Sequence, residues 1–564
     1  MPNLTKKIIG GKPYYYLREC QRVGGKPKIV STIYLGTPQR MLDRLMRPEP
    51  AKVAVREFGA SAAVFDMARQ LDVVRTIDRH VPKRGAQGPS VGEYLLLAAI
   101  NRCVAPRSKA QIGDWYQKTA LRRLLPFSPG QLSSQRFWDN MERVSPEQIA
   151  AIEHDLARTA VERFHLDLRC LLFDATNFFT FVDSFNSRAK LPQRGHAKQG
   201  RDDLRLLGLA LLVTSDGQVP LFHHTYPGNQ HDSVTFKSVA DDLLRRCRAL
   251  AQEACEITLV FDKGNNSHDN LETVGNSSLH FVGSLVPTQH KELLAVPRQQ
   301  MRRLDRARFP AVWSYRTSRL VFGAERTVLV TFNRGLFEAQ TKTLQREIGK
   351  RTRRLHELKT RLQRRRHDSG GKPPTVGSVQ RQVGEILRGR HMGDLFAVKV
   401  RQTPQGLPRL LFRFRDRAYQ RLSSTLLGKT VIFTDQTAWS DEQIVLAYRA
   451  QHHVEADFRR LKDPRYLTFR PTFHWTDQKL RVHAFYCILA LLMLNLLRRQ
   501  LANAGLQLST VKMMDALTEL REVTLLYPPP ANSQEPLVRT VLSEMDPTQQ
   551  KILDTLDLNR YRGT

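Results

Sequence analysis

Three acidic residues are placed where they could hold metal ions together. Asp174 and Asp262 each close an apolar run typical of a buried strand, and Glu455 lies inside a helical pattern. Acids at the ends of adjacent strands point into one cleft, and a helix crossing the sheet edge can add a third. Mg²⁺ prefers oxygen ligands, and two ions about 3.5–4 Å apart can activate an attacking hydroxyl and stabilise the leaving oxygen. Asp174, Asp262 and Glu455 are therefore the predicted catalytic residues and metal ligands.

Each of these acids also has an ordinary explanation. An aspartate at a strand end is commonly a turn former, and a glutamate on a basic helix is commonly an ion-pair partner. Their order along the chain and their surroundings support the joint interpretation more than any one position does.

The helix that carries Glu455 has further functional groups at helical spacing. Steps of 3, 4, 4 and 3 residues place one set on a single helical face: Tyr448, Gln451, Glu455, Arg459 and Lys462. Such a face suits a metal-bound glutamate flanked by groups that hold phosphates. A solvated, salt-bridged face has the same spacing, so the spacing alone leaves both interpretations open.

The charge of the chain indicates a polyanionic partner. The 564 residues include 88 Lys and Arg against 54 Asp and Glu, a formal net charge of +34. Two-metal chemistry together with this charge predicts DNA as the substrate. Beyond the Glu455 face, the expected DNA contacts are Lys263, Arg364, Arg365 and Arg366.

Other classes of protein fit the sequence poorly. The six cysteines form no Cys-x-x-Cys pair, which argues against a zinc site or a disulfide framework. Residues 1–16 lack the apolar core of a signal peptide, and the most apolar stretch, residues 484–497, is too short to span a bilayer. We therefore expect no membrane contact and a cytoplasmic protein, associated with DNA when it binds its substrate.

The hydropathy pattern predicts an α/β protein in which a ribonuclease-H-like catalytic core is interrupted by an insertion. The order of strands and helices from residue 166 is that of such a sheet, but its closing helix is delayed until residue 440. Six regions are expected: an N-terminal β-hairpin region (1–50), a helical, helix-turn-helix-like DNA-binding domain (51–165), the first part of the core (166–290), an insertion domain of β strands and a basic helical arm at 341–366 (291–435), the second part of the core with the Glu455 helix (436–503), and a C-terminal helical tail (504–564).

Two of these regions have alternatives. The short helices of residues 51–165 suit a DNA reader, and they suit a plain helical domain equally well. In the basic arm, apolar residues recur near heptad spacing at positions 344, 348, 355, 358 and 362, which predicts a short coiled coil or hairpin. Its cations lie all round the polar face, so backbone rather than base contacts are expected.

The sequence resembles the bacterial insertion-sequence transposases of the Asp-Asp-Glu type, in the branch with a Tyr-x2-Arg-x3-Glu-x6-Lys signature. Tyr448, Glu455 and Lys462 match the signature, and Gln451 departs from it. Flanking segments also fit one subgroup of that branch: residues 226–232 (YPGNQHD), 261–264 (FDKG) and 454–462 (VEADFRRLK). The resemblance extends over most of the chain.

The resemblance implies a ribonuclease-H-like core with a β-rich insertion before the glutamate helix. It also implies that Asp174, Asp262 and Glu455 bind two Mg²⁺ ions, for which Mn²⁺ can substitute. The expected partners are double-stranded DNA, as terminal inverted repeats and target, and a second copy of the chain in a homodimer. Two rivals stay open: a nuclease or resolvase that cuts without joining, and an inactive DNA-binding protein from a decayed element.

Overall fold

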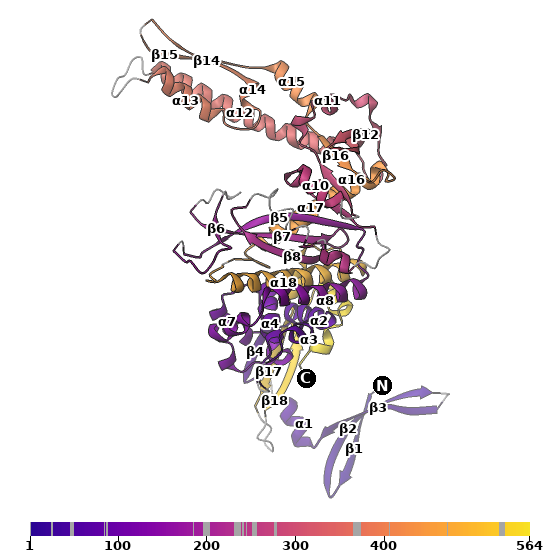
Figure 1. Cartoon of the computed structure of the whole chain (residues 1–564). Helices are drawn as coiled ribbons and strands as arrows, with labels where there is room; N and C mark the ends of the chain where they lie inside the picture. Colours follow the sequence, from indigo (N-terminus) through magenta and orange to yellow (C-terminus); the bar gives the residue numbers. More distant parts are fainter. Residues whose placement is uncertain are drawn as a thin grey trace.

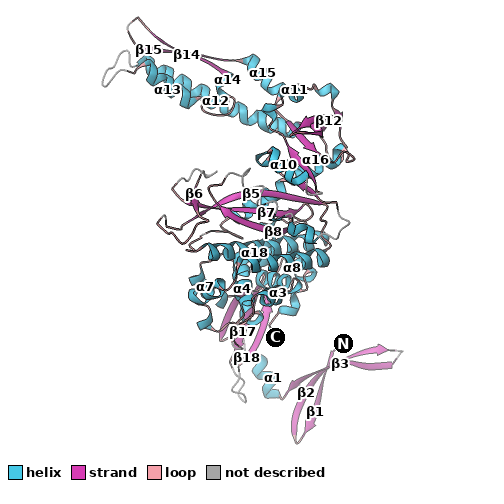
Figure 2. Ribbon diagram, viewed as in Figure 1, coloured by secondary structure: helices cyan, strands magenta, loops and turns pink. Residues whose placement is uncertain are grey.

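A computed structural model describes residues 2–23, 26–45, 50–83, 85, 88–183, 185–195, 203–230, 239, 242–243, 245–250, 256–275, 279–364, 374–404, 406–470, 472–528 and 536–563. It is a mixed α/β structure built on one large sheet (Figures 1 and 2). The strands follow the order β11-β12-β13-β16-β10-β9-β5-β7-β6, and β8 pairs with β7 outside this path. Their bounds are β5 (Cys170–Thr180), β6 (Gln193–Arg194), β7 (Arg205–Thr214), β8 (Pro220–Pro227), β9 (Thr258–Val260), β10 (His280–Ser284), β11 (Arg302–Arg303), β12 (Val312–Val321), β13 (Ala324–Asn333) and β16 (Lys429–Thr434).

The strands at the centre of this sheet are buried on both faces. In β7 every residue after Arg205 is buried, and β5 pairs with β7 antiparallel and with β9 parallel. A strand that is covered on both faces has a continuous run of apolar residues in its sequence. These strands were predicted from such runs. Residues 215–217 lie in the turn that joins β7 to β8, and Gly217 has a φ of 77°, which favours glycine.

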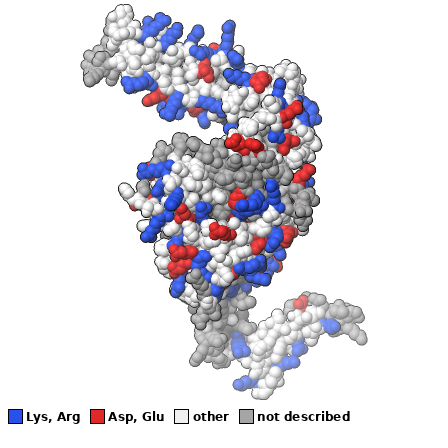
Figure 3. Space-filling model, viewed as in Figure 1, with Lys and Arg blue, Asp and Glu red and all other residues white. Residues whose placement is uncertain are grey.

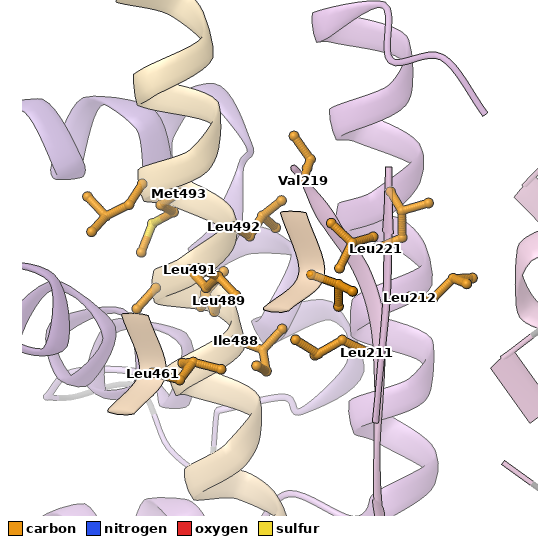
Figure 4. Close-up of a cluster of buried hydrophobic side chains, with 14 of the residues drawn as sticks. Leu211, Leu212, Val219, Leu221, Leu461, Ile488, Leu489, Leu491, Leu492 and Met493 are labelled. Carbon is orange, nitrogen blue, oxygen red and sulfur yellow. The ribbon is translucent and has the colours of Figure 1, made fainter. Parts of the chain in front are cut away.

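The helix α18 (Asp477–Asn503) forms the axis of the core below this sheet. Its side chains, among them Ile488 and Leu492, pack toward Leu211 of β7 and Leu221 of β8 (Figure 4). The helix is long and apolar enough to cross a membrane, but 94% of its most apolar window is buried inside the protein. It is therefore a core helix, and longer than the apolar stretch alone suggested.

The N-terminal helices pack around α18 and share its core. The helices α2 (Gly59–Gln70), α4 (Val91–Val104) and α8 (Pro146–Phe164) contact it directly. In α4 every residue except Glu93 is buried, so this helix offers no face to a DNA groove. Residues 51–165 therefore form a helical layer of the main core rather than a separate domain, and the helix-turn-helix-like DNA binding predicted for them stays a prediction. The remaining helices of this layer are α3 (Val73–His80), α5 (Ile112–Gln117), α6 (Leu121–Leu124) and α7 (Ser134–Glu142).

The two ends of the chain carry small sheets. The predicted hairpin is present as β2 (Lys12–Val23) and β3 (Lys26–Gly36), with an additional strand β1 (Pro2–Ile9), followed by α1 (Pro38–Leu45). Near the C-terminus β17 (Arg521–Tyr527) pairs with β18 (Leu537–Leu542) and with β4 (Lys52–Glu57) from the other end of the chain. The tail, predicted as helical, thus contains strands beside its helices α19 (Thr510–Glu519) and α20 (Pro547–Thr555).

The insertion is a smaller body than expected, because β11, β12, β13 and β16 belong to the main sheet. Its own core lies between one long helix and a two-stranded sheet (Figure 1). The elements are α12 (Arg334–Arg364), α13 (Val376–Ile386), α14 (Met392–Leu395), β14 (Phe396–Gln402), β15 (Pro408–Phe414) and α15 (Asp416–Thr425). The apolar stripe of α12 packs into this core through Leu344, Leu355 and Leu358, so the predicted coiled-coil arm is corrected to a helix of a small globular body.

Candidate active site

The two aspartates are brought together by the register of neighbouring parallel strands. Leu172 of β5 is paired with Val260 of β9, so two residues further on Asp174 stands opposite Asp262. Asp262 is extended, with φ −83° and ψ 161°, and therefore continues the line of β9. Side chains two residues apart on a strand share a face. Asp174 lies in the middle of β5, which continues to Thr180, and this corrects its predicted place at a strand end.

A third polar residue continues this row across the sheet. Val260 is paired with Val282 of β10, which brings Ser284 level with Asp262. The Ser284 side chain is buried and hydrogen-bonds to the Tyr448 hydroxyl. The sequence pointed to no role for Ser284, because a single serine at the end of an apolar strand has no distinguishing pattern. We call Asp174, Asp262 and Ser284 the polar row.

Tyr448 connects the polar row to the Glu455 helix. It lies on α16 (Asp441–Ala450), which begins with a capping box of Ser440 and Gln443. Burial raises the pKa of the Tyr448 hydroxyl, the Ser284 hydrogen bond lowers it, and the Asp262 and Glu455 carboxylates raise it further. Tyr448 is therefore within electrostatic reach of both carboxylates.

Glu455 lies on the outer face of α17 (His452–Lys462), a helix separate from α16. Glu455 and Arg459 are exposed, whereas Val454, Phe458 and Leu461 are buried. The closing helix predicted to begin at residue 440 is divided in two at Gln451, whose backbone stays helical with φ −53° and ψ −30°. The apolar face of α17 packs on the core, and the Glu455 carboxylate is open to solvent.

A buried aspartate anchors α17 from within. Asp457 is fully buried; it accepts hydrogen bonds from Arg460 at 2.5 Å and from the Asn495 amide at 3.0 Å. Burial raises the pKa of Asp457 to about 6, while Arg460 and Asn495 act in the opposite direction. This polar anchor ties the Glu455 helix to α18, and no local sequence pattern marks it.

Gln451 occupies a different position from the one predicted. It is buried, and its side-chain amide donates a hydrogen bond to the carbonyl oxygen of Phe173 at 3.0 Å. The expectation that Gln451 faces a DNA phosphate is therefore corrected: its amide joins the start of α17 to the strand residue before Asp174. Gln451 keeps a helical backbone, with φ −53° and ψ −30°, and its face of the helix packs against β5, where Lys462 also bonds to Thr176.

Of the predicted DNA-binding cations, one lies beside the polar row, two are exposed, and three have side chains that the structure does not describe. The Lys462 ammonium donates to the Thr176 hydroxyl at 2.8 Å, two residues along β5 from Asp174. Arg459 and Lys263 are exposed. Arg364 ends α12 with a side chain that is not described, and Arg365 and Arg366 lie outside the described residues.

A cavity of about 520 Å³ separates the polar row from the insertion. Lys263, Ser284 and Tyr448 line it on the core side, and Glu347 and Arg351 of α12 line it on the other. The visible surface of the insertion body carries many Lys and Arg side chains (Figure 3). Ser284 of the polar row and Tyr448 therefore line a space bordered by a basic helix, which suits a charged polymer.

The donor set fits divalent cations. Three carboxylates supply the oxygen ligands that Mg²⁺ prefers. In the described part of the chain, the trio of ligand side chains whose atoms all lie within 4.8 Å is a different one, His268, Asp269 and Glu272 on α10 (His268–Gly275). Two ions about 3.5–4 Å apart can be shared by acids that are not all in mutual contact, so the wider spacing of the three acids is compatible with a two-ion site.

A comparison with known protein families decides the class. A model of the transposase DDE domain matches residues 178–493, more than half of the chain. The chain belongs to the DDE transposase family. Asp262 and Glu455 lie inside the matched segment, and Asp174 precedes it by four residues. As a DDE transposase, the protein is a polynucleotidyl transferase and endonuclease that acts on DNA and depends on a divalent metal.

Further comparisons add little to this result. No curated protein sequence matches the chain. Among solved structures, a piggyBac transposase in a synaptic complex with hairpin DNA is similar at 9% sequence identity and a TM-score of 0.36, over 83% of this chain and 82% of the other.

Proposed function

We propose that this DDE transposase mobilises a bacterial insertion sequence: it cleaves the element ends and joins them to target DNA. The observation that carries the proposal is the polar row. Two aspartates stand opposite each other on neighbouring parallel strands, and Gln451 and Lys462 bond the Glu455 helix to β5, the strand of Asp174. Together with the match to the Tyr-Glu-Lys positions of the branch signature, this arrangement supports a ribonuclease-H-like core.

Asp174, Asp262 and Glu455 would hold two Mg²⁺ ions in this site. When bound, these ions would activate the attacking hydroxyl and stabilise the leaving oxygen. Gln451 fixes α17 against the strand of Asp174, and the Asp457 anchor fixes it against α18, so the residues around the site keep the carboxylates in place. Lys462, held beside Asp174 by Thr176, positions a phosphate of the DNA end.

The proposed partners are terminal inverted repeats, target DNA and a second copy of the chain. Two element ends must be held together for joining, which favours a homodimer. Short inverted repeats on both sides of the gene would supply the substrate sequence for the assay below.

The test is cleavage and joining of labelled duplexes that carry these repeats, with a supercoiled plasmid as target. We expect nicked and joined products with Mg²⁺ or Mn²⁺ and none with EDTA. Asp262→Asn should lose both products. Glu272→Gln, in the other cluster of possible metal ligands, is the matched control and should keep them.

Three outcomes separate the rivals. Cleavage without joined plasmid would indicate a nuclease or resolvase. Repeat binding without cleavage under any metal would indicate an inactive DNA-binding protein. Loss of activity in Glu272→Gln but not in Asp262→Asn would move the metal site to α10 and overturn the assignment.

A further inference from the structure

A second cavity, away from the carboxylates, combines aromatic walls with buried polar groups. Its volume is about 560 Å³, within the roughly 300–1,000 Å³ of small-ligand sites. Trp138 of α7 and the loop residues Phe473 and Trp475 line the mouth, and Lys109 and Tyr486 lie inside. We call this set the aromatic cavity.

The aromatic side chains at its mouth are unusually exposed. Trp138 is 40% exposed, Phe473 55% and Trp475 68%. Phe181 packs against Phe473 with ring centroids 5.3 Å apart and is itself exposed. A contiguous group of large exposed rings marks an interaction site.

The inside of the cavity carries hydrogen-bond donors that the protein does not fully use. Lys109 is only 8% exposed, and its ammonium makes one hydrogen bond, to the Tyr486 hydroxyl at 2.9 Å, while an ammonium has three donors. Arg102 also lines the cavity, and its buried Nε has no hydrogen-bond partner within the protein. A buried amino group with unused donors beside an apolar wall can bind a ligand that supplies acceptors.

The charge of this interior favours a ligand with acceptors and flat apolar faces. Burial and the neighbouring Arg102 lower the pKa of Lys109 well below its ordinary value. Burial, Lys109 and Arg102 lower the pKa of His474 to about 3, so that imidazole is neutral at pH 7. A nucleobase has these two properties, ring faces that stack on indoles and edge oxygens and nitrogens that accept hydrogen bonds.

The cavity lies past the end of β5, the strand that carries Asp174, because Phe181 packs against Phe473 at its mouth. Asp174 and Phe181 are seven positions apart, about 23 Å along the strand. Lys462 lies over the ring of Phe178 and Arg470 over the ring of Phe179. Side chains alternate along a strand, so Lys462 lies on the Asp174 face of β5 and Arg470 on the opposite face, which is also the face of Phe181.

We propose that the aromatic cavity binds an unpaired nucleobase of a DNA strand, stacked on Trp138 and Trp475 and hydrogen-bonded by Lys109. This inference takes only the polymer, DNA, from the proposed function. It does not depend on the carboxylate chemistry.

The test measures binding by fluorescence anisotropy, with EDTA present so that cleavage plays no part. The probes are a labelled 20-nucleotide oligothymidylate and a labelled 20-base-pair duplex. One base stack contributes about 5- to 100-fold in affinity. Trp138→Ala and Trp475→Ala should each weaken binding of the single strand by at least fivefold and leave duplex affinity within twofold.

Two controls keep the result interpretable. Trp475→Phe retains a stacking ring and should recover most of the single-strand affinity. Leu320→Ala removes another exposed apolar side chain, on β12, and should change neither probe. Melting temperatures of all variants are compared with the parent, so that misfolded variants are set aside.

Unchanged single-strand affinity in a folded Trp138→Ala/Trp475→Ala double variant would overturn the proposal. An equal loss for single strand and duplex would also overturn it, since it would indicate a general DNA or protein surface. Neither result would touch the cleavage assay of Asp262→Asn, so the two proposals fail separately.

Discussion

The helices α17 and α12 both face the proposed path of DNA, but they are held in opposite ways. The inner face of α17 is fixed by Phe458 and Leu461 and by the buried Asp457–Asn495 hydrogen bond. The helix α12 rests mainly on an apolar stripe, and most of its polar circumference is exposed, including its hydrogen bonds from Arg351 to the Arg388 carbonyl and from Arg361 to Gln382. A metal ligand needs placement within about 0.5 Å, whereas a cation that attracts phosphates acts over several ångströms. The two helices therefore differ in their support: a fully buried carboxylate holds α17, where position matters, whereas an apolar stripe with exposed hydrogen bonds holds α12, where charge matters.

The largest difference between the two helices is expected when one glutamate on each of them is replaced by glutamine. Glu455→Gln should reduce cleavage at least about a thousandfold, because it removes a group that acts on the chemical step. Affinity for the element end should stay within about threefold, since phosphate contacts elsewhere supply most of it. Glu357→Gln on α12 is the matched control and should leave both quantities unchanged. Cleavage of the Glu455→Gln variant at the parent rate would remove Glu455 from the site.

The polar anchor of α17 can be tested through pH. Because the pKa of Asp457 is raised to about 6 in the folded protein, its protonated form stabilises the fold. This contribution is fully present below about pH 4 and is lost as pH rises through 6, a change of about 3 kcal/mol. Asp457→Asn cannot ionise, so the difference in unfolding free energy between variant and parent should grow in favour of the variant from pH 4 to pH 7.

Urea unfolding at several pH values measures this difference. Other buried acids, such as Glu57, whose pKa burial raises to about 7, titrate equally in both proteins and cancel. A difference that does not vary with pH would mean that Asp457 is ionised throughout.

Gln451 separates packing from DNA contact at the junction of α16 and α17. Gln451→Arg places a charge where the structure has a buried amide bonded to Phe173, and should lower the unfolding free energy by about 2 kcal/mol. Arg459→Gln, on the exposed face, should change it by less than about 0.5 kcal/mol. A stable Gln451→Arg variant that binds DNA more tightly would show that position 451 faces the phosphates after all.

The smallest effects are expected on α12, where charge is shared among many side chains. Neutralising the exposed Lys350, Arg353 and Arg354 to Gln should weaken DNA binding by roughly tenfold at 100 mM salt, for all sequences alike. The slope of log affinity against log salt should fall by up to about 0.9 for each phosphate that the variant no longer neutralises. An unchanged slope would mean that α12 contacts protein rather than DNA.

Much of the site could be predicted from sequence because it rests on local patterns. Apolar runs ending near Asp174 and Asp262, and the capping box at Ser440, are visible without the fold. The burial of Gln451 was missed because its partner, the Phe173 carbonyl, lies far away along the chain. Ser284 and Asp457 were missed because their roles come from partners far along the chain, on α16 and α18.

The fold shows the same limit at a larger scale. The strands β12 and β13 were recognised but assigned to the insertion, because nothing local states that β13 pairs with β16. The stripe of α12 was identified correctly, yet heptad spacing does not distinguish a coiled coil from packing against β14 and β15. Which distant segments pair with each other is determined by the whole core and cannot be recognised in a short stretch of sequence.

The pairing of β4 with β17 has a consequence for how the protein is made. Glu57 near the start of the chain is aligned with Arg521 near its end. The ribosome synthesises β4 long before β17. It likewise synthesises α2 and α4 long before α18, the helix on which they pack. The nascent N-terminal half therefore emerges with apolar helix faces that only the last part of the chain can cover. Premature termination would leave those faces exposed, so an incomplete copy of this protein should be removed by aggregation or proteolysis rather than persist as a folded competitor.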